Sequence, residues 1–368
     1  MKHVLAIVPS LRMGGAEIQA LRNCEALLGA GYQVTLVTIF RVHGAFYAPY
    51  LAALQARGLR FHALLDQEVP LTPQGPRHFA SVLVKAVARL RALYDELRPD
   101  LVYTRLWYAS LVAWVTRAIA HHRPVLVFNE ESRFQGGFKG WARLFLMRRA
   151  GTWVVPCQGL FDEAVALGTP AGSGRVLPNI VDGPVPGGAR PGNGPLRLAF
   201  LGRLEPAKGL DRLLDVASRL RGVAFDLQLA GSGSLEGEVR AAIERQGLEG
   251  KVRLVGPVSD LAAFFGGVDL LLLTSHYEGF ANVIVEANAY GVPVLAMRVP
   301  HGPADIIREG RNGFLVPNGD VAGMVARLAH LTRAELATMR GACQAIAEEH
   351  YSVRSQQARW QALVEVAC

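Results

Sequence analysis

The sequence predicts an α/β protein with two Rossmann-like, doubly wound domains that face each other across a cleft. Three observations support this prediction. The chain has 368 residues, whereas single domains usually contain about 100–200 residues. Short apolar runs alternate with segments of helical periodicity, which is typical of a parallel sheet covered on both faces. This alternation is interrupted once by a segment rich in Pro and Gly, and then it starts again.

In the first half, the apolar runs are short and are expected to form buried parallel strands. The expected strands are 4–8, 34–39, 101–103, 125–128 and 152–155. Helical periodicity extends over 16–28, where a Gly-Ala-Gly sequence ends it, and it is clearest over 81–97, where an Arg-Pro pair follows. These segments define a first domain of residues 1–182.

Residues 183–195 consist mainly of Pro and Gly and contain almost nothing apolar, so we expect a linker there. The alternation then resumes and defines a second domain of residues 196–349. Its expected strands are 198–201, 226–230, 252–255, 270–274 and 294–296, and its expected helices are 210–220, 239–246 and 282–290, with further helices from residue 320 onward. Because open parallel sheets bind ligands at the carboxyl ends of their strands, we expect two such edges to face each other.

The charge of the chain is distributed unevenly. Residues 1–182 contain 20 basic and 12 acidic side chains, whereas residues 183–368 contain 19 of each, so the entire net charge of +8 lies in the first part. We expect this part to meet something anionic, such as a phospholipid surface, a phosphorylated lipid carrier or nucleic acid. A solvated basic face without a partner is the alternative. Nucleic acid is the least favoured partner, because the sequence contains no recognition motif and no basic run with interleaved aromatics.

The cysteines and the hydropathy pattern indicate the compartment. The four cysteines lie far apart and form no C-x-x-C pair, which favours free thiols in a reducing compartment. The apolar start of the chain is too short for a signal peptide, and no run of about 20 apolar residues is free of charge. We therefore expect a cytoplasmic protein that does not span a membrane.

The first chemical motif extends from Gly202 to Gly209 and reads Gly-Arg-Leu-Glu-Pro-Ala-Lys-Gly, between an expected strand and an expected helix. Glycine at such a turn lets the backbone approach a ligand, and the N-terminus of the following helix favours an anion. Arg203 adds a forked donor and Lys208 a point charge, which suits a diphosphate. The spacing is not that of the P-loop. The alternative is a surface turn that happens to be basic.

The second motif extends from Glu278 to Glu286 and reads Glu-Gly-Phe-Ala-Asn-Val-Ile-Val-Glu. Glu278 is expected in the loop at the carboxyl end of a strand, and Glu286 on the following helix. Two such carboxylates can bracket a polyhydroxy ligand, because carboxylates accept hydrogen bonds from paired hydroxyls. Glu286 stands between apolar residues, so it is expected to be partly buried and to need a partner. The alternative is a pair of acidic residues that serve only the helix dipole.

The order and separation of these two motifs resemble the family 4 retaining glycosyltransferases of GT-B fold. Further segments extend the resemblance over nearly the whole chain: Gly14-Gly15-Ala16-Glu17, 178–182, Gly231-Ser232-Gly233, 291–294 and 312–316. Each segment alone is a weak signal, but the ordered set is specific. We also expect the last helix, about residues 350–368, to pack back on the first domain, which would bind the acceptor.

The resemblance implies a role for each matching residue. Arg203 and Lys208 would hold the donor diphosphate and offset the charge of the leaving group. Glu278 would contact the hydroxyls of the donor sugar, and Glu286 the ribose. The further donor-binding positions that it implies are Gly14 and Gly15, through their backbone N–H groups, and Gly202, Gly231, Gly279, Phe280, Ala281 and Asn282. The expected catalytic residues are Glu278, Arg203 and Lys208.

The resemblance implies neither a metal nor another cofactor. The sequence contains no D-x-D motif, and the two cations can stabilise the departing diphosphate instead. Retention of the anomeric configuration is likewise implied by the family. The lack of an evident His or Asp base in the first domain favours retention over inversion.

The sequence departs from the family pattern in the first domain. Many members carry a His near the donor sugar, whereas the corresponding loops here contain none. Arg105, Asn129 and Glu130 lie in these loops and are the candidates for the acceptor side. The segment 301–305, His-Gly-Pro-Ala-Asp, is similar to that of members that add hexoses or N-acetylhexosamines to bacterial surface glycans.

The segment 133–149 mixes aromatic, aliphatic and basic residues, which suits a helix that lies on an anionic membrane surface. A core helix with a basic outer face is the alternative, and the sequence does not decide between the two. Together with the charge asymmetry, the segment favours a peripheral enzyme at the inner face of the cell membrane.

We therefore predict a retaining glycosyltransferase that moves a hexose or N-acetylhexosamine from a nucleotide-diphosphate sugar, with UDP as the expected nucleotide. The expected acceptor is a glycan or a lipid-linked glycan in the synthesis of a cell-surface polysaccharide such as lipopolysaccharide. A non-catalytic nucleotide-sugar-binding subunit is the main alternative. A dehydrogenase-like dinucleotide binder is disfavoured, because no G-x-G-x-x-G motif follows a strand.

Overall fold

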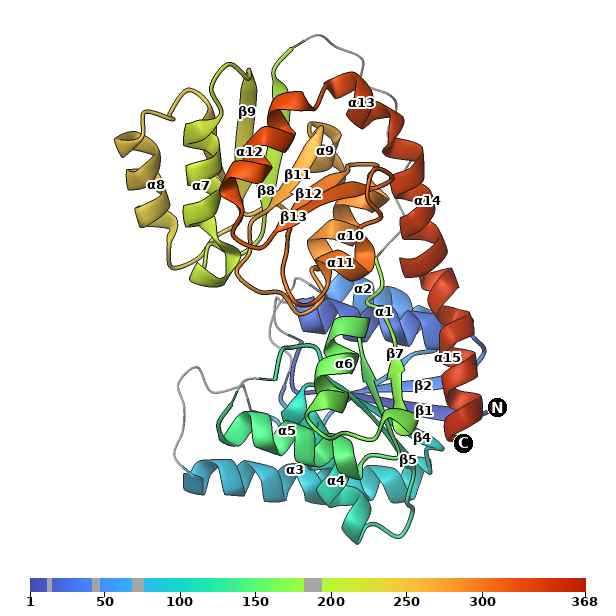
Figure 1. The fold of residues 1–368 in the computed structure, drawn as a ribbon. Coiled ribbons are helices and arrows are strands. Elements are labelled where there is room, and N and C mark those ends of the chain that lie inside the picture. Colours follow the sequence, from blue (N-terminus) through green and yellow to red (C-terminus); the bar gives the residue numbers. More distant parts are fainter. Residues whose placement is uncertain (12–14, 42–46, 68–75, 135, 182–193) are drawn as a thin grey trace. The chain divides into compact units, whose positions relative to one another are not determined.

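The computed structural model describes residues 1–368 except 12–14, 42–46, 68–75, 135 and 182–193. The described chain divides into two compact units, one formed by Met1–Ile180 with Val353–Cys368 and the other by Val181–Ser352. Each unit contains one parallel sheet flanked by helices (Figure 1). The two sheets confirm the predicted α/β fold. The expected linker, 183–195, lies outside the described residues except for its last two positions.

The first sheet has seven parallel strands in the order β3-β2-β1-β4-β5-β6-β7. Its strands are β1 (His3–Val8), β2 (Gln33–Thr38), β3 (Arg60–Ala63), β4 (Leu101–Arg105), β5 (Val125–Asn129), β6 (Thr152–Val155) and β7 (Gly174–Val176). The central strands β1 and β4 are buried along their whole length. This full burial explains why they read as continuous apolar runs instead of alternating ones.

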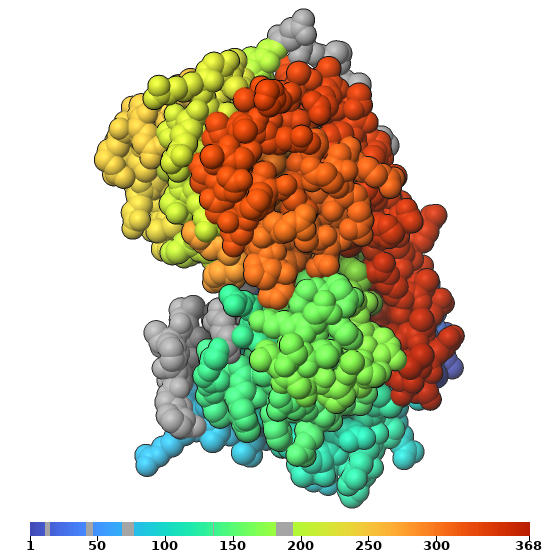
Figure 2. All heavy atoms as spheres, in the orientation of Figure 1, coloured from blue at the N-terminus to red at the C-terminus, as the bar shows by residue number. Residues whose placement is uncertain are grey.

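Two helix layers cover the faces of the first sheet. The helices of this unit are α1 (Gly15–Gly29), α2 (Ala48–Ala56), α3 (Pro76–Leu97), α4 (Trp107–Ile119), α5 (Phe138–Arg149), α6 (Gln158–Ala166), α15 (Val353–Ala367) and the short 3-10 helix η1 (Ala171–Ser173). Helices α1, α2 and α15 share one apolar core with the sheet, whereas α3, α4 and α5 share another. In the space-filling view, the visible face of this unit consists mainly of teal and green atoms, the colours of α4, α5 and α6 (Figure 2).

The last helix, α15, belongs to the first unit although it follows the second unit in the sequence. Trp360 anchors it there, because its side chain is fully buried. The indole Nε1–H of Trp360 donates to Asn23 Oδ1 at 2.9 Å, and its ring meets the ring of Tyr103 edge-on with 4.8 Å between centroids. The apolar ring thus fills the core while its polar atom has a partner, as buried Trp side chains require.

The second sheet has six parallel strands in the order β10-β9-β8-β11-β12-β13. Its strands are β8 (Leu196–Leu201), β9 (Phe225–Ala230), β10 (Val252–Gly256), β11 (Leu270–Leu273), β12 (Val294–Arg298) and β13 (Gly313–Pro317). This is the strand order of the dinucleotide-binding Rossmann fold, in which the direction of strand addition reverses between the first and the fourth strand. Here the reversal falls between β8 and β11.

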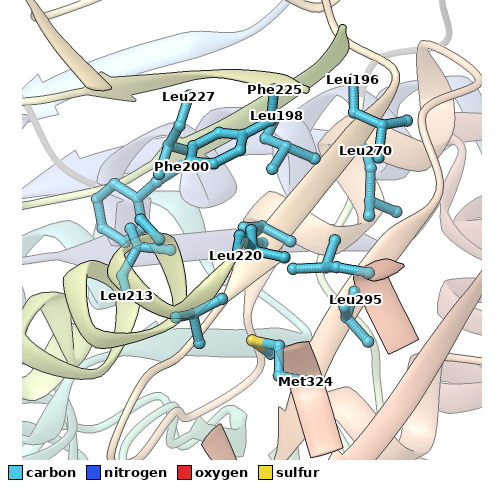
Figure 3. Close-up of a cluster of buried hydrophobic side chains, with 14 of the residues drawn as sticks. Leu196, Leu198, Phe200, Leu213, Leu220, Phe225, Leu227, Leu270, Leu295 and Met324 are labelled. Carbon is cyan, nitrogen blue, oxygen red and sulfur yellow. The ribbon is translucent and has the colours of Figure 1, made fainter. Parts of the chain in front are cut away.

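Helices on both faces complete the second unit. They are α7 (Leu210–Arg219), α8 (Glu236–Arg245), α9 (Leu261–Gly266), α10 (Asn282–Ala289), α11 (Pro303–Ile306), α12 (Val321–His330), α13 (Arg333–Thr338), α14 (Arg340–Tyr351) and the 3-10 helix η2 (Pro206–Lys208). Side chains of α7 and α12 pack on the sheet, where Leu213 and Met324 join Phe200, Leu227 and Leu295 (Figure 3). Every one of these five side chains is at least 99 % buried.

Three strands are absent from the sequence-based expectation, namely β3, β7 and β13. Each lies at an edge of its sheet. Strand β3 is only partly buried and β7 has three residues. Strands β3 and β7 therefore carry no long apolar run, so periodicity alone does not identify them. Strand β13 does contain a short apolar run, 314–316, which is not among the strands expected from the sequence. Among the described residues, no helix has the length and apolar character needed to cross a bilayer.

Replacing Trp360 is expected to loosen α15 from the first unit. The Trp360→Ala variant should lower the free energy of unfolding by about 3–5 kcal/mol, the usual effect of emptying a large aromatic site. Urea unfolding followed by circular dichroism measures it. Trp141→Ala is the matched control, because Trp141 is 58 % exposed. Equal unfolding midpoints for the two variants would contradict this account of α15.

Candidate active site

Both chemical motifs lie at the carboxyl end of the second sheet, where the strand order reverses. The segment from Gly202 to Gly209 follows β8, and the loop that contains Glu278 follows β11. Strands β8 and β11 are hydrogen-bonded neighbours. Ligands of open parallel sheets bind outside this point, because the loops diverge there and leave a crevice. Two motifs that are far apart in the sequence therefore meet at one position.

In the glycine turn after β9, the backbone packs directly against the backbone of the loop after β8. Gly231 has a φ of +137°, and a Cβ there would collide with the carbonyl oxygen of Gly202. The N–H of Leu204 donates to the carbonyl oxygen of Ser232 at 2.8 Å. Glycine is required at position 231 for both its conformation and its lack of a side chain. The turn holds the loop of Arg203 in a fixed place.

A second close approach joins the loop after β8 to the loop after β11. Gly209 has a φ of +63°, and a Cβ there would collide with the carbonyl oxygen of Thr274. The hydroxyl of Thr274 donates to the carbonyl oxygen of Gly209 at 2.9 Å. The N–H of His276 donates to the carbonyl oxygen of Ala207, also at 2.9 Å. These contacts bring the side chains of the two motifs together.

Lys208 and Glu278 form an ion pair between these loops. The ammonium Nζ of Lys208 donates to both carboxylate oxygens of Glu278, at 2.7 and 2.9 Å. The hydroxyl of Ser275 donates to Oε1 of the same carboxylate at 2.6 Å. Glu278 is only 7 % exposed, and a carboxylate at this depth is stable only with such partners. The sequence predicted both residues for one site but not their pairing, nor the contribution of Ser275.

Arg203 adds a second cation to the loop after β8. Its side chain is exposed, in contrast to that of Lys208. The neighbouring Glu205 accepts hydrogen bonds from the N–H of Ser234 at 3.1 Å and from its hydroxyl at 2.7 Å. These bonds, more than the nearby Arg203, hold the pKa of Glu205 below its ordinary value. The loop thus presents one exposed cation and one partly buried cation, which is a suitable arrangement for a diphosphate.

The segment before α10 has an unusual backbone. Ala281 has φ +67° and ψ +60°, a left-handed conformation that is rare for residues other than Gly. Ala281 is buried, as is Phe280, whose ring meets that of Tyr351 with 5.8 Å between centroids. A Cβ at Gly302 would collide with the carbonyl oxygen of Phe280. Strained backbone of this kind persists where the surroundings hold it, and it is frequent at functional sites.

The other predicted donor-binding residues occupy the same end of the second sheet. Gly279 follows Glu278 directly, and Asn282 begins α10. Glu286 lies one turn further along α10 and is partly buried, in agreement with the expectation from its apolar neighbours. In the first unit, Gly15 begins α1 and is exposed, whereas Gly14 lies outside the described residues.

The three acceptor-side candidates gather at neighbouring strand ends of the first unit. Arg105 ends β4 and Asn129 ends β5, and the two are partners in the parallel register. Arg105 is 1 % exposed and donates to the hydroxyl of Tyr103 at 3.0 Å and to Oδ1 of Asn179 at 2.8 Å. A contact with the carboxylate of Glu131 completes its surroundings. Arg105 is therefore held by protein groups.

Glu130 is buried in a similar way. Its carboxylate accepts a hydrogen bond from Nε of Arg143 at 2.6 Å and another from the N–H of Glu131 at 2.9 Å. Burial raises the pKa of the Glu130 carboxyl, and the Arg143 guanidinium opposes this shift. In the part of the chain that the structure describes, Asn129 Oδ1 is buried without a hydrogen-bond partner. The role of these three residues stays a prediction.

Within the described ranges, no group of three or more His, Cys, Asp and Glu side chains is arranged to hold a metal ion. The four cysteines are free thiols, three of them buried and Cys368 exposed. That the reaction needs no metal stays a prediction from the family resemblance.

The fold and the site together define a class of protein. Two Rossmann-like units, of which the second presents a glycine-rich cationic loop at its switch point, are the architecture of the GT-B glycosyltransferases. Two family models match the chain: "Glycosyl transferase 4-like domain" over residues 14–180 and "Glycosyl transferases group 1" over residues 195–334. The chain belongs to this family of glycosyltransferases.

Individual relatives agree with this assignment. The lipopolysaccharide core biosynthesis glycosyltransferase LpsE of Rhizobium meliloti is 35% identical over 123 residues, which are 33% of this chain and 35% of the relative. The D-inositol 3-phosphate glycosyltransferase of Mycobacterium bovis is 28% identical over 274 residues, 67% of this chain and 57% of the relative. The chain thus spans between about a third and somewhat over half of the length of these curated relatives.

A solved structure shows the same fold over the whole chain. HepE of Anabaena, determined in complex with UDP and glucose, superimposes with a TM-score of 0.80 at 20% sequence identity and covers 100% of both chains. At this level of identity the likeness establishes the fold alone.

Removing the hydroxyl of Ser275 is expected to destabilise the second unit. Ser275→Ala should lower the free energy of unfolding by about 1.5–3 kcal/mol, the usual contribution of a hydrogen bond to a charged group. Ser218→Ala is the matched control, because that hydroxyl is exposed and donates to the neutral carbonyl oxygen of Asp215. Urea unfolding measures both. If the two variants are equally stable, Ser275 does not support the Glu278 carboxylate.

Proposed function

We propose that the protein is a retaining glycosyltransferase that uses a nucleoside-diphosphate sugar, with UDP as the nucleotide. The observation that carries this proposal is the loop of Arg203 and Lys208 at the switch point of the second sheet, beside the carboxylate of Glu278. Transfer breaks the bond between the anomeric carbon of the sugar and the diphosphate oxygen, and a hydroxyl oxygen of the acceptor forms the new bond to that carbon. The hydroxyl proton passes to the departing diphosphate, on which negative charge accumulates as its bond breaks. Two cations that are already in place stabilise that charge in the transition state.

We expect the donor to break the ion pair between Lys208 and Glu278 when it binds, and so to rearrange the site. A diphosphate carries more negative charge than one carboxylate and competes with Glu278 for the ammonium group of Lys208. When the ammonium turns to the phosphate, the carboxylate is free to accept hydrogen bonds from sugar hydroxyls. Ser275 keeps one oxygen of Glu278 in position during this exchange. Donor binding and sugar recognition are thereby coupled through one pair of side chains.

The names of similar proteins support a cell-surface acceptor. LpsE is described as acting in lipopolysaccharide core biosynthesis, and the structural neighbour WaaB as a lipopolysaccharide outer core galactosyltransferase. We propose that the transferred sugar is a hexose or N-acetylhexosamine and that the acceptor is a glycan or lipid-linked glycan. The proposed location is the cytoplasmic face of the cell membrane, with the protein bound peripherally to anionic lipid.

Donor binding tests the proposal. The protein is incubated with UDP-, GDP- and ADP-sugars, and thermal unfolding and release of nucleoside diphosphate are followed. We expect a UDP-sugar to stabilise the protein, and Lys208→Ala to weaken its binding by roughly 10- to 100-fold, as expected for the loss of charge-assisted hydrogen bonds to the diphosphate. Glu278→Ala should also weaken binding of the UDP-sugar, because the bonds to the sugar hydroxyls are lost, but it should not weaken binding of UDP, which only competes with Glu278 for Lys208.

Lys251→Ala is the control for this measurement. Lys251 belongs to the same unit, but its ammonium lies over the ring of Phe225, 5.5 Å from the centroid. Undiminished binding to Lys208→Ala and Glu278→Ala would contradict the proposed site. Donor binding that depends on both residues, without transfer to any glycan acceptor, would instead favour a non-catalytic nucleotide-sugar-binding subunit.

A further inference from the structure

The net charge of the chain is concentrated in one of the two helix layers of the first unit. Helices α3, α4 and α5, here called the α3–α5 layer, carry nine basic and two acidic residues: Arg77, Lys85, Arg89, Arg91, Arg117, Lys139, Arg143, Arg148 and Arg149 against Asp95 and Glu96. The layer on the opposite face, α1, α2 and α15, carries three of each. The first layer thus accounts for a charge of +7 and the second for zero.

Most cations of the α3–α5 layer are directed to solvent. Arg143 is paired with Glu130, and Arg91 lies 4.0 Å from Asp95. The other seven basic residues are all exposed. Helix α6, beside this layer at the edge strands, adds Asp162 and Glu163, of which Glu163 faces Arg133 at 3.6 Å. The exposed charge of the layer itself is therefore strongly positive, and it attracts an anionic surface.

The same layer exposes apolar side chains. Five of the ten exposed large hydrophobic residues in the described chain belong to it: Phe79 (38%), Val84 (68%), Ile119 (51%), Phe138 (75%) and Trp141 (58%). A groove of about 660 Å³ runs between α3 and α4, and its walls are mainly aliphatic side chains such as Val84, Val115 and Ile119. Apolar and cationic side chains on one face are the combination that binds the headgroup region of a bilayer.

On α5 the aromatic residues form a row. Phe138, Trp141 and Phe145 follow at helical spacing, with ring centroids 6.2 and 5.3 Å apart, and the guanidinium of Arg149 lies over Phe145 at 5.0 Å. Arg143 fastens this helix to the body of the unit through Glu130. The row is thus rigidly presented, and aromatic rings beside cations are typical of the membrane interface.

Exposed or partly exposed aromatic side chains of the layer lie near the starts of α3, α4 and α5. These helix starts lie at the carboxyl ends of the strands, where the acceptor-side candidates are found. Helix α4 begins two residues after β4, so Trp107 lies near Arg105, and the ring of Phe79 on α3 stacks on Trp107 with 6.3 Å between centroids. Helix α5 likewise begins after β5, on the side of Asn129. An acceptor that is anchored in a bilayer by a lipid would reach this edge of the sheet directly.

We propose that the α3–α5 layer docks on an anionic lipid bilayer, with the aromatic row of α5 in the headgroup region, and presents the carboxyl edge of the first sheet to a lipid-linked acceptor. The part that concerns the acceptor rests on the proposed function. Charge complementarity favours anionic lipid. The exposed aliphatic side chains of Val84 and Ile119 favour a bilayer over nucleic acid, because a bilayer buries aliphatic groups whereas bases stack on rings. The rings of Phe138 and Trp141 suit both partners, so the test includes single-stranded DNA.

The test is flotation of the full-length protein with vesicles of phosphatidylglycerol and phosphatidylcholine in equal parts, and with vesicles of phosphatidylcholine alone. We expect binding to the first and not to the second, and weaker binding as the salt concentration rises. Lys85→Gln with Arg89→Gln should weaken binding by roughly 10- to 30-fold, because each cation near an anionic surface contributes about 1 kcal/mol.

Arg219→Gln with Arg240→Gln is the matched control, since it removes two exposed charges from helices α7 and α8 of the second unit. This control should bind as the parent does. Lipids brominated near the headgroup should quench tryptophan fluorescence of the parent, and Trp141→Phe should remove a large part of that quenching.

Three outcomes would overturn the proposal: equal binding to both kinds of vesicle, an equal loss in the two double variants, or binding to single-stranded DNA without binding to vesicles. The vesicles contain neither donor nor acceptor. Loss of docking with intact donor binding would therefore refute only this inference, and the reverse pattern would refute only the proposed function.

Discussion

Lys208 and Glu278 are separated by 70 residues, and their ion pair depends on the strand order of the second sheet. Only because β8 and β11 are neighbours do the two loops meet, and only because Gly209 lacks a side chain can they approach so closely. A buried carboxylate without partners would be strongly destabilising. The ammonium of Lys208 and the hydroxyl of Ser275 remove that penalty while leaving the ammonium accessible to a stronger anion.

The same pair explains why a site for an anion can be stable before the anion arrives. Two cations close together repel each other, but here the partly buried one is neutralised by Glu278 and the exposed one is solvated. In the proposed mechanism a diphosphate replaces the carboxylate, so that the protein exchanges one charged contact for another. Because the left-handed Ala281 and the tightly packed Gly231 turn hold the surrounding backbone, we expect this exchange to move only a few side chains.

Much of the fold could be predicted from the sequence, because the buried central strands of a parallel sheet are continuous apolar runs. The edge strands β3 and β7 could not, since so few residues there are buried. For the site, glycines and cations located both loops, but no spacing rule states which strands become neighbours. The pairing of Lys208 with Glu278, and the hydrogen bond from Ser275, are consequences of that order.

Two features of the first unit also could not be predicted from the sequence alone. Arg105 is a charged residue at a position that the family resemblance assigns to the acceptor side, yet its buried guanidinium donates to Tyr103 of its own strand and to Asn179, which follows β7. The excess of basic residues was evident from the sequence, but their position in one helix layer follows from right-handed crossovers that place α3, α4 and α5 on the same face.

A crystal structure of the protein with UDP would show whether a diphosphate takes the place of Glu278 beside Lys208. We expect diphosphate oxygens at the carboxyl ends of β8 and β11, within about 3 Å of the Lys208 ammonium and the Arg203 guanidinium. We also expect that Lys208 no longer contacts both oxygens of Glu278. Diphosphate bound elsewhere, or an ion pair unchanged beside it, would contradict the account.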